Sequence, residues 1–212
     1  VAWSSRPYSF SAATDPVLAR LAMSLALWAH QGRPLPSPSS APRPPPTIFD
    51  PCCGSGTVLF VAASQGLPAC GCDLNPLAVE GATRNLEHAA DVLGWPMALR
   101  PLVVNHDCTA GPLPPGVLSV VAARDGSLSC TTTTSSSSFP EAAAHSSGAI
   151  VLASLPWGRQ QRLSHAFHVH DILTALRTQL PGATFCCLSA SSIRDTLAEC
   201  GRTAGLEVEV AG

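Results

Sequence analysis

Apolar residues in this chain fall into two kinds of segment, and the order of these segments predicts the fold class. Short apolar or β-branched runs typical of buried strands occur at residues 48–50, 68–73, 100–105, 149–153, 183–189 and 206–210. Stretches with helical spacing of apolar positions occur at residues 58–65, 76–93, 170–180 and 193–204. The run at 149–153 is apolar at every position, as expected for a parallel strand covered on both faces. We therefore expect an α/β fold with a mostly parallel sheet in a three-layer sandwich.

A further helix and a loop precede the first strand. Residues 1–13 are irregular, after which Thr14 or Asp15 provides an N-cap and Pro16 stands in the first helical turn. Gly32 ends this helix, and residues 33–46 are rich in proline, which predicts a loop. We expect the apolar residues at helical spacing to form a packing face: Val17, Leu18, Leu21, Leu25 and Trp28. The segments 1–32 and 33–46 would thus precede a domain at 47–212.

Residues 109–147 interrupt the alternation of strands and helices. A Gly- and Pro-rich turn at 111–115 precedes a plausible extra strand at 117–123. Residues 131–138 are only Thr and Ser, a low-complexity run that is too polar to pack in a core. We therefore expect an insertion at about 109–147 within the domain.

Composition limits the partners and the compartment. The 46% hydrophobic content of the 212 residues supports one domain with a core, and the net charge is only −2, with every basic residue an arginine. Such a chain lacks the positive surface needed to bind a nucleic acid backbone unaided. Nine cysteines without a Cys-x-x-Cys pair favour a reducing, intracellular setting. The cytoplasm or the nucleus is favoured over an organelle. No apolar stretch is long enough for a membrane span, and we expect no membrane association.

Residues 50–57, Asp-Pro-Cys-Cys-Gly-Ser-Gly-Thr, carry most of the chemical information. Gly54 and Gly56 allow a ligand to approach the main chain, and Thr57 opens a helix whose free N–H groups face the loop. This arrangement suits a nucleotide-like ligand. The Asp50 carboxylate would repel phosphate, and it favours a ligand with an amine or another cation. A dinucleotide-binding Gly-x-Gly-x-x-Gly loop is the alternative, but Leu59 stands at its third glycine position.

The 50–57 motif resembles the first motif of class I S-adenosylmethionine-dependent methyltransferases. Its form is similar to that of the THUMP-associated RNA methylases, which modify the N2 amine of guanine in tRNA and rRNA. The run from Gly71 to Leu86, Gly-x-Asp-x-Asn-x-x-Ala-x-x-x-Ala-x-x-Asn-Leu, is similar to the second motif of the same family. The resemblance implies the catalytic domain only: a Rossmann-like class I methyltransferase sandwich, truncated at both ends, with strand order 3-2-1-4-5-(7)-6.

The resemblance also implies S-adenosyl-L-methionine as cofactor and roles for individual residues. The segment around Arg6 and Asp15 is similar to the one before the first motif in this family, which implies that the helix there forms one wall of the cofactor pocket. Asp73 would bind the ribose hydroxyls, and Asp107 would accept the adenine amine with help from the neighbouring main chain. The residues implied in cofactor binding are Asp50, Pro51, Cys52, Gly54, Ser55, Gly56, Thr57, Asp73, Leu74, Asn75, Asp107 and Cys108.

Residues 154–159, Ser-Leu-Pro-Trp-Gly-Arg, follow the fourth predicted strand and resemble the Asp/Asn-x-Pro-aromatic-Gly motif of amino-group methyltransferases. The implied catalytic residues are Ser154 and Leu155, which would accept N–H bonds from the substrate amine, with Pro156 fixing the turn and Trp157 stacking on an extruded base. Ser154 departs from the family pattern, which has Asp or Asn there. Two nearby arginines are candidates for binding a substrate phosphate, Arg159 and Arg162.

His165 and His168 fall on one helix face and His170 follows them, but no acid or cysteine completes a metal set, and we expect no metal. The sequence therefore favours an S-adenosylmethionine-dependent methyltransferase acting on an exocyclic amine of guanine in RNA. Among RNAs, tRNA is the favoured substrate. An RNA-binding segment absent from this chain would supply much of the affinity for the RNA substrate. The alternatives are methylation of adenine in DNA or of glutamine in protein, and a cofactor-binding scaffold that has lost catalysis at Ser154.

Overall fold

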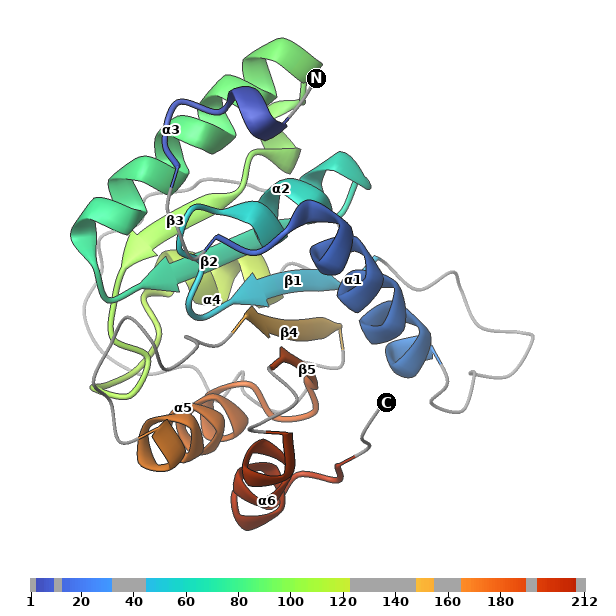
Figure 1. Cartoon of the computed structure of the whole chain (residues 1–212), viewed down its shortest axis with the longest axis vertical. Coiled ribbons are helices and arrows are strands. Elements are labelled where there is room, and N and C mark those ends of the chain that lie inside the picture. The colour runs from blue at the N-terminus through green and yellow to red at the C-terminus, as the bar shows by residue number, and fades with distance from the viewer. Residues whose placement is uncertain are drawn as a thin grey trace.

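The computed structural model describes residues 3–9, 13–31, 45–122, 148–154, 165–189 and 194–208 (Figure 1). At its centre is a parallel sheet whose strands are β1 (Thr47–Asp50), β2 (Ala69–Asp73), β3 (Leu102–Asn105), β4 (Ala149–Ser154) and β5 (Thr184–Leu188). The strand order is β3-β2-β1-β4-β5, so the direction of winding reverses between β1 and β4. The predicted α/β, Rossmann-like sandwich is confirmed, including the order of its first five strands.

Helices cover both faces of this sheet. The helical elements are η1 (Trp3–Ser5), α1 (Pro16–Gln31), α2 (Thr57–Ser64), α3 (Pro76–Leu93), η2 (Met97–Leu99), α4 (Pro115–Ala122), α5 (His165–Gln179) and α6 (Arg194–Thr203). Helices α1, α2 and α3 pack on one face, α4 and α5 pack on the other, and α6 lies against α5 (Figure 1). None of the helices in the described ranges has the length and apolar character needed to cross a bilayer.

Alternation along the strands divides the core into two layers. On β1, Ile48 packs with residues of α1, α2 and α3, whereas the next residue, Phe49, packs with residues of α4 and α5. Both side chains are completely buried. Because successive side chains of a strand point to opposite faces, a sheet covered on both sides needs apolar residues at consecutive positions. That requirement explains why the strand segments were visible as continuous apolar runs.

Helix α1 packs through the face opposite to the predicted one. Its small residues Ala19, Ala22 and Ala26 are buried together with Met23. The predicted packing face is exposed by 53–71% at each position, so the prediction of a packing face is wrong for these residues: Val17, Leu18, Leu21, Leu25 and Trp28. Helical spacing identifies residues that share a face, but it does not say which face meets the sheet. Here alanines allow the helix to approach its neighbours closely.

Helix α4 corrects a second prediction, the extra strand at 117–123. Val117 and Val121 are buried four residues apart on one side of the helix, against the layer that contains Phe49. The β-branched residues favoured a strand, but tertiary packing overrides that weak preference. Pro115 at the first position suits a helix start because the N–H that proline lacks has no partner there in any helix.

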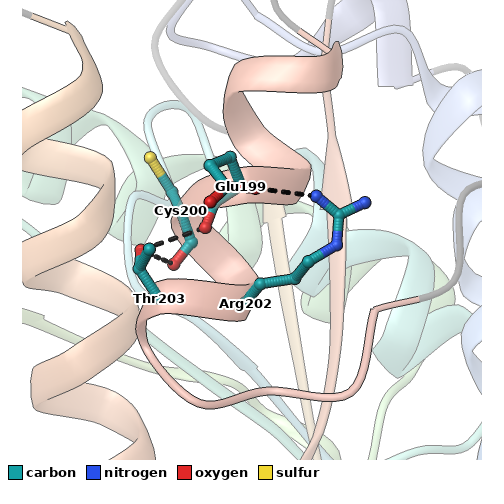
Figure 2. A network of polar contacts seen from close by, with 4 residues as sticks. All are labelled: Glu199, Cys200, Arg202 and Thr203. Atoms are coloured by element: carbon teal, nitrogen blue, oxygen red, sulfur yellow. Dashed lines mark hydrogen bonds and ion pairs between the residues drawn. The ribbon is translucent and has the colours of Figure 1, made fainter.

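The C-terminal part of the structure ends in helix α6. Arg202 donates to the Glu199 carboxylate at 2.9 Å, and the Thr203 hydroxyl donates to the carbonyls of Glu199 and Cys200 at 3.0 and 3.1 Å (Figure 2). The Thr203 bonds lie in the last turn of α6, where the Cys200 carbonyl also accepts the Ala204 N–H at 2.9 Å. Residues 206–208 are irregular, which corrects the predicted sixth strand in that part of its span. Helix α5 also begins earlier than the predicted residue 170.

Candidate functional site

Polar side chains end four neighbouring strands at one edge of the sheet. Asp50 ends β1, Asp73 ends β2, Asn105 ends β3 and Ser154 ends β4. All strands are parallel, so these ends lie at the same edge, and Asp50 and Ser154 flank the point where the strand order reverses. In open α/β sheets, ligands bind in the crevice outside this point. The topology thus brings the predicted cofactor acids and the first predicted catalytic residue to one edge.

The loop between β1 and α2 depends on its two glycines. Gly54 and Gly56 have φ values of 51° and 85°, in the left-handed region where side chains are strained. A Cβ added to Gly56 would lie 3.3 Å from the Leu86 side chain, so the loop packs tightly onto α3. A Cβ on Gly54 would meet nothing within 4 Å, so the main chain there borders open space. The loop is therefore fixed on one side and accessible on the other.

Asp50 is a buried acid beside this loop. The residue is 1% exposed, and one carboxylate oxygen accepts the Cys52 N–H at 3.1 Å. Burial raises its pKa to about 8, and the nearby Asp73 charge adds to the shift, whereas the Cys52 bond opposes it. None of the ion pairs within the described ranges includes either acid. A cationic ligand group would stabilise the ionised form of this carboxylate.

Asp73 is held in place by main-chain donors. One carboxylate oxygen accepts the Gly54 N–H at 2.9 Å, and the other accepts the Asn75 N–H at 2.9 Å. Asn105 secures the turn that follows, because its side-chain amide donates to the carbonyls of Asp73 and Leu74 at 2.9 and 3.0 Å. Each carboxylate oxygen keeps a further lone pair. The group is thus oriented and able to accept hydrogen bonds from two hydroxyls.

The two residues after Asp73 differ in what they offer a ligand. Leu74 is 69% exposed, an apolar surface beside the two acids. Asn75 has a structural task, because its side-chain oxygen accepts the Leu77 N–H at 3.0 Å and caps α3. The predicted cofactor role of Leu74 has surface available to it, whereas the Asn75 oxygen is already engaged.

The segment after β3 contains the residues predicted to bind adenine. The Asp107 carboxylate accepts the hydroxyl and the N–H of Thr109 at 2.7 and 2.9 Å, and these bonds lower the pKa of Asp107. Cys108 is buried, and the neighbouring Cys72 side chain lowers its pKa. The Gln179 amide donates to the Cys108 carbonyl at 3.5 Å. The structure places Asp107 in a local turn and the Cys108 side chain in the core, and their adenine role stays a prediction.

The inner side of the glycine loop meets the N-terminal segment. Ser55 and Thr57 are each 2% exposed, and the Thr57 hydroxyl accepts the Trp3 indole N–H at 3.2 Å. The Ser55 carbonyl accepts the side-chain amide of Asn85 at 3.0 Å. Sequence reasoning assigned no role to Trp3, and it included Asn85 only as the last asparagine of the second motif. A signal for Asn85 was present, because this polar residue interrupts the apolar stripe of α3 next to Leu86.

Other predicted site residues lie outside the described residues. Residues 155–164 fall outside the described ranges, and with them the remaining predicted catalytic and phosphate-binding residues: Leu155, Pro156, Trp157, Arg159 and Arg162. None of the cysteines within the described ranges forms a disulfide bond. In that same part of the chain, no group of three or more His, Cys, Asp or Glu side chains is arranged to hold a metal ion.

Comparison with known proteins gives likenesses of fold. No protein-family model and no curated protein sequence matches the chain. The rRNA methyltransferase aviRa of Streptomyces viridochromogenes is 23% identical with a TM-score of 0.49, and the match covers 85% of this chain and 76% of that one. A TehB-like S-adenosylmethionine-dependent methyltransferase of Corynebacterium glutamicum is 17% identical with a TM-score of 0.45, covering 92% and 86%. A precorrin 8w decarboxylase of Methanobacterium thermoautotrophicum is 16% identical with a TM-score of 0.48, covering 96% and 77%.

Proposed function

We propose that this chain is an S-adenosylmethionine-dependent N-methyltransferase whose acceptor is an exocyclic amine of guanine in RNA, with tRNA as the favoured substrate. The observation that carries the proposal is the buried Asp50 carboxylate beside the two-glycine loop, at the switch point of the sheet. Asp73 ends the neighbouring strand. Two acids at this position favour a ligand that offers positive charge to one and a ribose diol to the other.

S-adenosylmethionine fits these residues better than a dinucleotide does. Its ammonium group would neutralise Asp50, and its ribose hydroxyls would bind Asp73. A pyrophosphate would bring negative charge to a carboxylate that is already difficult to ionise. Leu59 also occupies the position of the third glycine and is completely buried in the core. The exposed Leu74 would then cover one face of the adenine ring.

The chain's own residues would hold the acceptor amine in line with the methyl group. When bound, the cofactor supplies an electrophilic methyl on a sulfonium. Ser154, at the end of β4 and across the switch point from Asp50, would accept one N–H of the amine. The Leu155 carbonyl would accept the second, and Trp157 would stack on the base, as the sequence motif implies. Orientation of the amine then accounts for much of the rate.

A second candidate is a cofactor-binding scaffold without transferase activity, and Ser154 is the observation in its favour. A serine hydroxyl is shorter than the Asp or Asn side chain of the resembling motif and has no carbonyl. Cofactor binding without methyl transfer to any tRNA in a mixed pool would favour this candidate. Methylation of adenine in DNA or of glutamine in protein would appear instead as transfer to those substrates.

Calorimetric titration with S-adenosylmethionine tests the cofactor site directly. We expect the wild type to bind and Asp50→Asn to bind about 10- to 100-fold more weakly, because a charge-assisted hydrogen bond is lost. Asp73→Ala should also weaken binding, through the ribose. Asp91→Asn is the matched control, since Asp91 pairs with Arg100 on the surface at 2.9 Å. A folded wild type, shown by circular dichroism, that binds no S-adenosylmethionine would contradict the proposal.

A further inference from the structure

Asn85 is a polar residue at the centre of a buried contact between three segments. It is completely buried on α3. Its side-chain oxygen accepts the Tyr8 N–H at 2.8 Å, and its side-chain nitrogen donates to the carbonyls of Tyr8 and Ser55, each at 3.0 Å. Both N–H groups of the amide are therefore used. One side chain joins the N-terminal segment, helix α3 and the glycine loop.

The N-terminal segment is seated against α2 and α3 by its aromatic side chains, and Figure 1 shows it beside these helices. The Tyr8 ring lies on Gly81, where an added Cβ would come within 2.3 Å of the ring. Trp3 stacks on Phe60 at 4.2 Å between ring centroids, and its indole donates to Thr57. The segment 3–9 therefore contacts α2 through Trp3 and α3 through Tyr8, and Asn85 links Tyr8 to the glycine loop.

We propose that Asn85 is a positioning residue for cofactor binding, an inference that rests on the proposed function. By fixing the Ser55 carbonyl, it sets the main chain of residues 54–56, which borders the amino-acid end of the cofactor. The Tyr8 main chain holds the Asn85 amide in the required orientation. The N-terminal segment is thus part of the cofactor site although it lies on the inner side of the loop and touches no cofactor atom.

The chemistry of the position favours asparagine in particular. Two carbonyl oxygens and one N–H converge on the side chain, and a primary amide supplies the matching two donors and one acceptor. Aspartate has nearly the same shape but would direct oxygens at the Ser55 and Tyr8 carbonyls. Asn85→Asp should therefore displace the loop with little change in packed volume.

The test compares two ligands, S-adenosylmethionine and 5′-methylthioadenosine, which lacks the amino-acid half. We expect Asn85→Asp to weaken S-adenosylmethionine binding at least about tenfold, since buried hydrogen bonds are lost at the loop. Binding of 5′-methylthioadenosine should weaken much less, since it lacks the amino-acid half that borders residues 54–56 and is linked to them only through Asp73, which accepts the Gly54 N–H at 2.9 Å. A residue that only stabilised the fold would affect both ligands equally or neither.

Two further variants complete the design. Gly81→Ala places a methyl group where the Tyr8 ring packs, without altering Asn85 or the loop. It should reproduce the selective loss of S-adenosylmethionine affinity even if Asn85→Asp fails to fold. Leu176→Ala is the control, because it lowers stability from the opposite face of the sheet. Two outcomes would overturn this inference and leave the proposed function intact, provided that the wild type binds S-adenosylmethionine. In the first, both variants bind S-adenosylmethionine as tightly as the wild type does. In the second, both variants lose affinity for the two ligands to the same extent. Wild type that binds neither ligand overturns the proposed function as well.

Discussion

The carboxyl group of Asp50 links the pH of the solution to both stability and ligand binding. Its pKa in the folded chain is about 8, raised by burial from an ordinary value of 3.8. Between these two values, the folded chain holds a proton that the unfolded chain has released. Linkage then requires that stability falls as pH rises, because unfolding releases the proton more readily at high pH. The stabilising effect is fully present below about pH 4 and is lost as pH passes through 8.

We expect the free wild-type chain to lose stability between about pH 5 and 8, and Asp50→Asn to show a much flatter profile, since asparagine does not titrate. Urea unfolding at several pH values measures both curves. Because other groups titrate in the same range, the difference between the two proteins is the quantity to examine. A parallel pair of curves would show that Asp50 does not carry the effect.

The binding of S-adenosylmethionine should reverse the shift at this residue. A bound ammonium group favours the ionised carboxylate, so the Asp50 proton present at pH 7 should leave on binding. Titrations in buffers with different ionisation enthalpies measure this release, which belongs to the same prediction. Uptake of protons, or no exchange at all, would contradict the proposed contact.

At the level of single elements, β2 shows how closely the strand and the glycine loop are packed. A Cβ on Gly71 would lie 2.8 Å from the Asp50 carbonyl and 3.0 Å from both Cys53 and Leu59. We expect Gly71→Ala to lower the free energy of unfolding by about 1–3 kcal/mol and to weaken cofactor binding, since the added methyl pushes the backbone that carries Asp50.

Gly116→Ala is the matched control for this substitution. Gly116 lies in helix α4, and its added Cβ would meet only the Leu102 side chain, at 3.4 Å. That variant should gain about 0.4–1 kcal/mol, because alanine restricts the unfolded chain. Urea unfolding of both variants gives the comparison. Equal effects at the two positions would show that the close approach at Gly71 is unimportant.

The elements also show where sequence patterns suffice and where they fail. Strands such as β4 could be predicted because a doubly covered strand must be apolar at consecutive positions. The orientation of α1 could not, because hydrophobic spacing marks Leu21 and Leu25 as strongly as Ala22, and only the tertiary contacts distinguish them. In α4 the valines favoured a strand on local preference, whereas their burial four residues apart is a helical property that needs the sheet beside it.

For the molecule as a whole, topology explains how much of the site could be predicted. Acids at the ends of consecutive parallel strands must meet at one edge, so Asp50 and Asp73 could be placed together from sequence alone. The contacts of the N-terminal segment could not, since Trp3 and Thr57 are 54 residues apart and Tyr8 and Asn85 are 77 apart. Such pairs follow from the packed structure and leave no periodic signal.

Charge is a property of the whole surface, and here it bears on the proposed binding of RNA. The net charge is −2. Within the described part of the chain, four arginines are paired with neighbouring acids: Arg84, Arg100, Arg194 and Arg202. Positive charge that is paired in this way contributes little to attraction of a phosphate backbone. Arg159 and Arg162 are the candidates for phosphate contacts because they follow the predicted catalytic segment in the sequence.

We therefore expect the chain to bind tRNA weakly, with a dissociation constant of about 10⁻⁴–10⁻⁶ M at physiological salt and a shallow salt dependence. Two phosphate contacts correspond to a slope of about −1.8 in a plot of log affinity against log salt concentration. Replacing Arg159 and Arg162 with glutamine should bring the slope close to zero, because no counterions remain to be released there. Arg202→Gln, which removes an arginine already paired with Glu199 at 2.9 Å, should leave the slope unchanged. Fluorescence anisotropy over a range of salt concentrations measures these slopes, and a steep slope that survives the double substitution would place the RNA contacts elsewhere on the molecule.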